Sequence, residues 1–148
     1  MVETITVERL RDMIDADADF VLFDTRSPDS FADWHVAGAR NVEYSGSADE
    51  LVGDFDADVV DAGDTVVVTC RTGASARSFA EYLEREGYAH DVKVVDGGMQ
   101  AWSLVYDEVP IATANDDLVV VQLQRRAKGC LGYLVGSKRA GEAALVDV

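Results

Sequence analysis

Short apolar runs alternate with amphipathic stretches over the first two thirds of the chain. Three runs predict buried strands: residues 20–23, the β-branched residues 65–69, and residues 92–95 with valine at three of four positions. Shorter strands are expected near Ile5 and near Val42. Apolar runs of this length, bounded by turn residues, are typical of strands covered on both faces.

Helical periodicity fills the segments between these runs. Residues 7–16 follow Thr6 as an N-cap, and residues 28–34 follow Ser27 with proline at a first-turn position. The clearest helix covers residues 75–86, with one apolar stripe and a stop at Gly87. Another helix is expected to open near residue 97. Strands alternating with helices predict an α/β fold with a central, mostly parallel sheet and helices on both faces.

The composition changes after Pro110. Residues 1–110 hold 24 acidic and 8 basic side chains, whereas residues 111–148 hold 4 acidic and 5 basic ones. We therefore predict a domain over residues 1–110, a linker over 111–117 and a short β-rich extension over 118–148. Within the extension, residues 118–123, 130–135 and 143–148 are expected to be strands, with a turn over 136–141.

The net charge of −15 limits the kinds of partner that the chain can bind. A surface this acidic repels phosphate backbones, so no nucleic-acid partner is expected. Only 3 of the 13 basic residues are lysine. Scarce lysine and dispersed acid favour adaptation to a salt-rich cytoplasm, where screening reduces self-repulsion. An ordinary acidic protein is the alternative.

The remaining composition predicts a cytoplasmic protein without metal or membrane. No apolar run reaches the ~20 residues of a membrane span, and the N-terminus has no secretory pattern. The two cysteines, Cys70 and Cys130, do not suggest a disulfide framework. His35 and His90 form no zinc-type spacing with them.

The segment after the strand at residues 65–69 has the features of a nucleophile loop. Cys70 is followed by Arg71, Thr72, Gly73, Ala74 and Ser75, and the predicted helix begins there. The N–H groups of such a loop, together with the helix dipole, form a cradle that favours a thiolate. An inert buried cysteine is the alternative, but strand, cysteine, glycine-bearing loop and helix together favour a nucleophile.

Three short motifs follow one another within residues 3–110. The first motif is Asp24-Thr25-Arg26, followed by Phe31, His35, Gly38-Ala39 and Asn41-Val42. The second is the C-x-x-G loop at Cys70, and the third is Gly97-Gly98 with Trp102. With these motifs in this order, residues 3–110 resemble the rhodanese family of single-domain sulfurtransferases. Many members carry arginine or threonine at the sixth loop position, where this chain has Ser75. The choice of sulfur donor therefore stays open.

The resemblance implies a rhodanese-like fold with five strands and sulfur transfer through a Cys70 persulfide. The loop residues 71–75 would bind the substrate, with Arg71 attracting a small anionic sulfur donor, and a thiol would accept the sulfur. Asp24 and Arg26 are expected to be a buried scaffold pair, and His35 a structural histidine. No cofactor and no metal are implied.

Two other functions are alternatives to sulfur transfer. A phosphatase loop of this kind needs C-x₅-R, whereas the sixth residue after Cys70 is Ala76 and the arginine, Arg77, comes one position later. The other alternative is a non-catalytic interaction module of the same fold. Such modules often lack the cysteine that this chain keeps.

Residues 118–148 resemble the opening strands of metallo-β-lactamase-fold hydrolases. The H-x-H-x-D-H zinc motif of that family is absent here, so neither zinc nor hydrolysis is implied. Cys130 is expected to be a buried strand residue. Three strands alone are marginally stable, which leaves packing on the first domain, self-association or mobility. An unpaired strand edge at Val146 favours self-association. The alternative partner of these strands is a missing second domain.

Overall fold

The structure is a computed structural model that describes residues 2–44, 55–61 and 63–147. The chain divides into two compact units, Met1–Trp102 and Ser103–Val148. The first unit contains β1 (Glu3–Ile5), α1 (Val7–Asp15), β2 (Val21–Asp24), α2 (Pro28–Asp33), β3 (Arg40–Asn41), β4 (Thr65–Thr69), α3 (Ala74–Glu86), β5 (Asp91–Val95) and α4 (Gly98–Trp102), with a short 3₁₀ turn at Ala57–Val59. The second unit contains β6 (Tyr106–Ile111), β7 (Leu118–Arg125), β8 (Leu131–Ser137) and β9 (Glu142–Val146).

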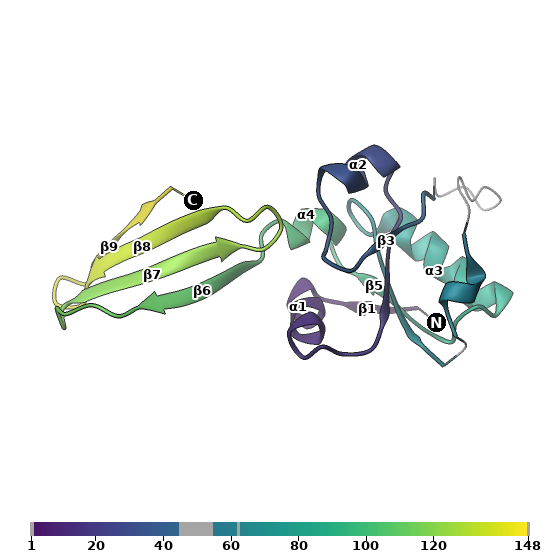
Figure 1. Cartoon of the computed structure of the whole chain (residues 1–148), viewed down its shortest axis with the longest axis horizontal. Helices are drawn as coiled ribbons and strands as arrows, with labels where there is room; N and C mark the ends of the chain where they lie inside the picture. Colours follow the sequence, from purple (N-terminus) through teal and green to yellow (C-terminus); the bar gives the residue numbers. More distant parts are fainter. Residues whose placement is uncertain (1, 45–54, 62, 148) are drawn as a thin grey trace. The chain divides into compact units, whose positions relative to one another are not determined.

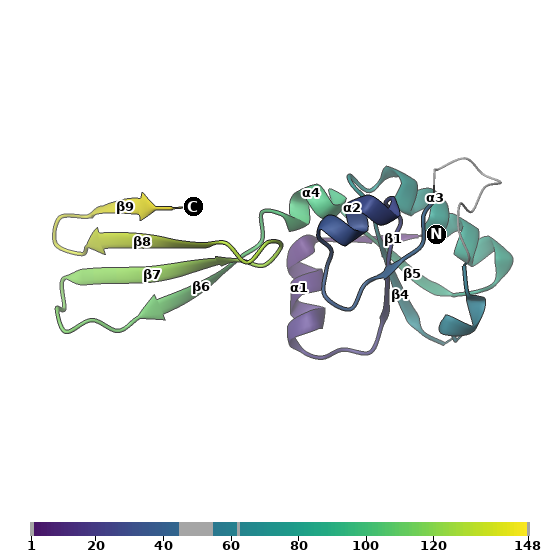
Figure 2. The ribbon, with the colours of Figure 1, turned by 45° about the horizontal axis from the view of Figure 1, so that its top comes forward.

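The first unit is a parallel five-stranded sheet in the order β1-β5-β4-β2-β3. Helix α3 lies on one side of this sheet, and α1 and α4 lie on the other (Figures 1 and 2). The expectation of an α/β fold with a central parallel sheet is therefore confirmed. Strand β4 is central, so the loop that follows it opens at the middle of the carboxyl edge, where α/β folds bind ligands.

Alternating side chains of the strands supply both faces of the core. Val66 and Val68 of β4 pack with the apolar stripe of α3, of which Phe79 and Leu83 are fully buried. Val67 points to the opposite face and is also fully buried. Burial on both faces explains why β4 is apolar at every core position instead of alternating.

The helix ends follow the predicted capping signals. Thr6 Oγ1 accepts a hydrogen bond from Arg9 N–H at the start of α1, and Ser27 Oγ accepts one from Ser30 N–H at the start of α2. Helix α3 ends at Gly87, whose φ of +76° is a left-handed cap.

The second unit is an antiparallel meander in the order β6-β7-β8-β9. Three of its strands were predicted, but β6 was not. Its residues 106–111 pair with β7, so the expected boundary after Pro110 lies inside a strand, and residues 112–117 connect two paired strands. Proline has no N–H to donate to a neighbouring strand. Strand β6 tolerates Pro110 because it lies at the edge of the sheet, where a proline nitrogen can face solvent.

Cys130 was expected to be a buried strand residue, and this is wrong. The side chain is exposed and lies directly before β8. Gly129, with a φ of +69°, turns the chain there, and a residue in that turn stays outside the ladder. Among the described residues, no helix has the length and apolar content that a membrane crossing requires.

Candidate active site

Cys70 lies at the carboxyl end of β4, at the start of the loop that leads into α3. Its side chain is 3% exposed, whereas Arg71, Thr72 and Ala74 are exposed. Gly73 is the N-cap of α3 with a φ of +101°, a backbone conformation that favours glycine. The loop therefore turns sharply around the sulfur and leaves Arg71 and Thr72 open to solvent.

The backbone of this loop contacts the sulfur directly. Gly73 N–H donates a hydrogen bond to Cys70 Sγ, with 3.0 Å between nitrogen and sulfur. Gly73 also directly precedes the 13-residue helix α3 as its N-cap, and the amino end of a helix carries partial positive charge. Both effects stabilise negative charge on the sulfur.

Helix α4 holds the opposite side of the loop. Met99 N–H donates to Cys70 O at 2.8 Å, and Gln100 N–H donates to Arg71 O at 3.1 Å. The two loop carbonyls are thus bound by α4. A peptide unit whose carbonyl is bound on one side presents its N–H toward the other, so α4 helps to fix the cradle.

Gly98 allows α4 to approach this closely. Its φ is +53°, and a Cβ atom at this position would overlap Cys70 O and lie 3.0 Å from Arg71 O. The Gly-Gly motif was identified from sequence, but this contact was not. The contact joins the backbones of two segments that are 28 residues apart, and such a contact produces no pattern of side chains in the sequence. The glycine at position 98 is therefore the one sequence feature that indicates it.

A second link joins the loop to β2. Thr25, which is buried, donates its N–H to Thr69 O at 2.9 Å. Its hydroxyl lies 3.3 Å from Thr69 O and 3.4 Å from Ser75 Oγ. The Ser75 hydroxyl therefore contacts the residue that directly follows β2. Thr25 was part of the first sequence motif, but nothing in the sequence indicated its contact with the loop.

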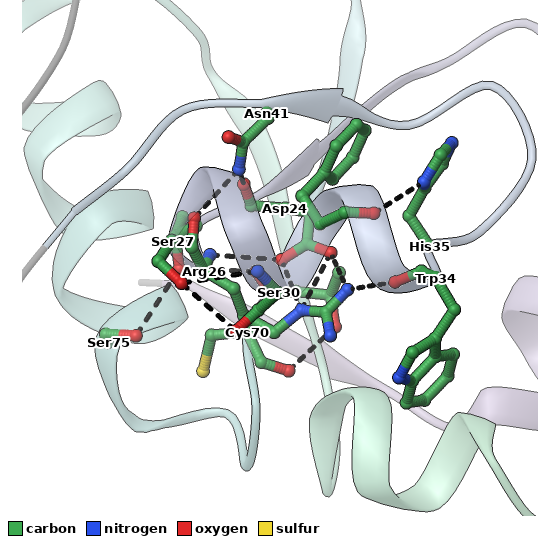
Figure 3. Close-up of polar contacts among 12 residues, drawn as sticks. Asp24, Arg26, Ser27, Ser30, Trp34, His35, Asn41, Cys70 and Ser75 are labelled. Atoms are coloured by element: carbon green, nitrogen blue, oxygen red, sulfur yellow. Dashed lines mark hydrogen bonds and ion pairs between the residues drawn. The ribbon is translucent and has the colours of Figure 1, made fainter.

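Asp24 and Arg26 form the expected ion pair (Figure 3). Arg26 Nε lies 3.0 Å from both Asp24 carboxylate oxygens, and Arg26 Nη2 lies 2.7 Å from Oδ2. Arg26 also donates to Trp34 O, and the Asn41 amide donates to the carbonyls of Asp24 and Arg26. Asp24 is fully buried, so these bonds offset the cost of burying its charge.

His35 lies with α2. Its Nδ1 is 2.8 Å from Phe31 O, and its ring stacks on Phe31 with centroids 3.9 Å apart. The side chain is exposed. The structural role of His35 stays a prediction.

Arg77 is directed to β1. Its Nη2 donates to Thr4 Oγ1 at 2.7 Å, and the preceding Ala76 is buried. The guanidinium is thus bound to the edge strand, away from the position that a phosphatase arginine needs. Among the described residues, no three His, Cys, Asp or Glu side chains gather as a metal site.

Comparison with known proteins shows relatives of the segment that contains this site. A model of the rhodanese-like domain matches residues 6–104. The thiosulfate sulfurtransferase GlpE of Pseudomonas aeruginosa is 34% identical over 105 residues, which cover 70% of this chain and 86% of the relative. GlpE of Pseudomonas putida is 36% identical over 95 residues, which cover 64% and 77%.

Solved structures share the fold of the first unit. A rhodanese-like domain protein from Staphylococcus aureus has a TM-score of 0.56 at 23% identity and covers 68% of this chain and 91% of its own. A human single-domain sulfurtransferase has a TM-score of 0.55 at 20% identity and covers 69% and 96%.

Proposed function

The chain belongs to the rhodanese-like family and is a sulfurtransferase of that type, and from this premise we propose that Cys70 carries the transferred sulfur as a persulfide. The observation that carries the proposal is the Gly73 N–H bond to the buried Cys70 Sγ. A backbone N–H directed at this sulfur can stabilise the negative charge that the attacking and transferred sulfur atoms carry during the reaction.

Loading begins with a small anionic donor such as thiosulfate, the substrate named for the GlpE relatives. The Cys70 thiolate attacks the outer sulfur of thiosulfate. A bond forms between Sγ and that sulfur, the sulfur–sulfur bond of the donor breaks, and sulfite leaves with the electron pair. A persulfide donor reacts the same way, with a thiolate leaving.

The loop then holds the terminal sulfur of the persulfide. We expect the N–H groups of residues 71–75 to face this atom, as Gly73 N–H faces Sγ. Helix α4 supports this arrangement, because it binds the Cys70 and Arg71 carbonyls and so helps to orient the N–H groups of the next residues. The Thr25–Ser75 contact keeps the far end of the loop in place. A loop fixed before the reaction needs no reorganisation when charge moves onto the sulfur.

Arg71 and Thr72 form the entrance. Residues 1–102 carry 22 acidic and 8 basic side chains, so the domain as a whole repels an anionic donor. An exposed arginine beside the nucleophile supplies a local positive charge for the donor's oxygens. Asp24, Arg26 and His35 support the fold around the site and take no part in the chemistry.

Release completes the cycle. A thiolate acceptor, or cyanide in an assay, attacks the terminal sulfur, the Sγ–S bond breaks, and the Cys70 thiolate is regenerated. The chemistry uses no metal and no organic cofactor. Phosphatase chemistry is disfavoured because Arg77 is bound to Thr4.

Intact mass after incubation with thiosulfate separates the candidate functions. Sulfur transfer predicts a gain of one sulfur atom, which cyanide removes. A phosphatase would instead release phosphate from an aryl phosphate and gain no sulfur. Absence of any adduct with thiosulfate or a persulfide donor would support a non-catalytic module.

A further inference from the structure

In the part of the chain that the structure describes, the large exposed apolar side chains gather in the second unit. Among the described residues, eight large apolar side chains are classed as exposed, and all lie within 103–148: Leu104, Val109, Ile111, Leu118, Leu131, Val135, Leu145 and Val146. Four strands in a single layer leave two faces without a covering element of their own (Figure 2).

The strand register places six of these side chains on one face. Residues directly opposite in antiparallel strands point to the same side, and Val120 is opposite both Ile111 and Val135. Alternation along each strand gives the other members. We name this surface the Val120 face; its apolar members are Val109, Ile111, Leu118, Val120, Leu131, Tyr133, Val135, Ala144 and Val146.

Glu142, at the start of the edge strand β9, also lies on the Val120 face, at its margin. The polar side chains nearer the centre of the face have partners. Gln122 Nε2 donates to Tyr133 Oη at 2.9 Å, and Gln124 Nε2 donates to Gln122 Oε1 at 2.8 Å. Asp107 lies on an edge strand and forms an ion pair with Arg126 at 2.6 Å. The centre of the face can therefore be buried without stranding a charge.

The charge of the second unit indicates what kind of molecule covers the Val120 face. Residues 103–148 carry six acidic and five basic side chains, a near balance in a strongly acidic chain. On the Val120 face itself, the acidic strand residues are Asp107, which is paired with Arg126, and Glu142 at the margin. An apolar face with so few ionic groups is poorly suited to a charged partner, whereas it can pack against a second copy of itself. We propose that the Val120 face packs against the Val120 face of a second copy of this chain.

The area of the Val120 face gives the order of magnitude of the dissociation constant of this dimer. Four strands at ~4.8 Å spacing and about seven residues at ~3.3 Å each give a face of roughly 450 Å². Side-chain relief raises this value, so two faces bury roughly 1,000 Å², near the lower limit of specific interfaces. We therefore expect reversible association with a dissociation constant of about 1–100 μM.

Sedimentation equilibrium of the full chain tests the proposal. Wild type should approach twice the 16.0 kDa chain mass as concentration rises. Val135→Lys should raise the dissociation constant at least ~10-fold, because the interface would bury an unpaired ammonium. Glu108→Gln changes the charge equally but lies on the opposite face, and should leave association unchanged.

Val135→Thr is a second variant for the case in which Val135→Lys does not fold. Threonine keeps the β-branched shape of valine, and its hydroxyl should also weaken the dimer. Far-UV circular dichroism checks that the strands persist in each variant. A wild-type chain that stays monomeric at about 200 μM overturns the proposal. Association that survives both Val135 substitutions also overturns it, and points to pairing through the free edge of β9. A monomer that binds phosphatidylcholine vesicles assigns the face to lipid instead.

Discussion

At the scale of single residues, the site relies on backbone groups. The hydrogen bond to Cys70 Sγ comes from Gly73 N–H, and the loop is held by the N–H groups of Met99 and Gln100. Substitutions that move the backbone should therefore affect sulfur transfer more than exposed substitutions nearby.

Cys70→Ser should reduce sulfur transfer to cyanide to the uncatalysed background, because a hydroxyl forms no persulfide and is far less acidic. The fold should persist, since serine is close in size to cysteine. Steady-state thiocyanate formation is the measurement, with Cys130→Ser as the matched control at the exposed cysteine. Activity retained in Cys70→Ser and lost in Cys130→Ser would move the nucleophile to Cys130.

Gly98→Ala should reduce kcat/KM by at least ~10-fold and destabilise the fold by about 1–3 kcal/mol, because the new Cβ overlaps Cys70 O. Gly87→Ala is the control. Its φ of +76° carries the same backbone cost, yet nothing lies within 4 Å of the added atom. Equal effects of the two variants on kcat/KM, measured with thiosulfate and cyanide, would show that α4 does not position the loop.

At the scale of elements, the sequence predicted the helices and strands whose pattern lies within their own residues. The stripe of Ala76, Phe79, Ala80 and Leu83 placed α3 to within one residue, and Thr6 and Ser27 placed two helix starts. Strand β6 was missed because Pro110, Asp107 and Glu108 are unusual in strands and its order comes from pairing with β7. The Thr25–Ser75 and α4–loop contacts were missed for a related reason, since each joins segments distant in sequence.

An ion-pair cluster joins three strands of the parallel sheet. Lys93 of β5 lies 2.6 Å from Glu3 of β1 and 2.7 Å from Asp91, and Thr65 of β4 donates to Asp91. The hydrogen bond from Lys93, followed by that from Thr65, lowers the pKa of Asp91 below its ordinary value of 3.8. The ionised carboxylate therefore adds stability above the unfolded-state pKa, and this is lost as pH falls through the folded-state pKa.

Asp91→Asn should lower the free energy of unfolding at pH 7 by only about 0.5 kcal/mol, because half of the side chain is exposed and solvent screens the pair. The difference from wild type should shrink toward zero as pH falls below about 3.8. Urea unfolding from pH 7 to pH 3 measures it, and Glu81→Gln on α3 controls for loss of one exposed charge. A difference that does not change with pH would contradict the assigned cause.

At the scale of the whole molecule, the net charge of −15 should make stability depend on salt. Raising KCl from 0.1 M to 1 M shortens the Debye length from about 10 Å to about 3 Å, which weakens self-repulsion. We expect Tm to rise by at least about 4 °C in a thermal scan. Sucrose of equal osmolality should give a smaller rise, and a Tm unaffected by KCl would fit an ordinary acidic protein instead.

The division into two units predicts that residues 1–104 suffice for sulfur transfer. The family match ends at residue 104, and the second unit begins at Ser103. A chain ending at Leu104 should keep its kcat/KM within about twofold, because the hydrogen bonds at Cys70 described above come from the first unit. Unfolding or loss of transfer would place the C-terminal sheet within the working domain. The likeness of residues 118–148 to a metallo-β-lactamase-fold opening stays a prediction.

The most direct test of the account is the position of the transferred sulfur. The protein is incubated with thiosulfate, persulfides are trapped by alkylation, and the peptides are analysed by mass spectrometry. We predict one extra sulfur atom on the peptide containing Cys70 and none on the peptide containing Cys130. This extra sulfur should be lost when cyanide is added before alkylation. An extra sulfur on Cys130, or none on either peptide while thiocyanate is still formed, would contradict it.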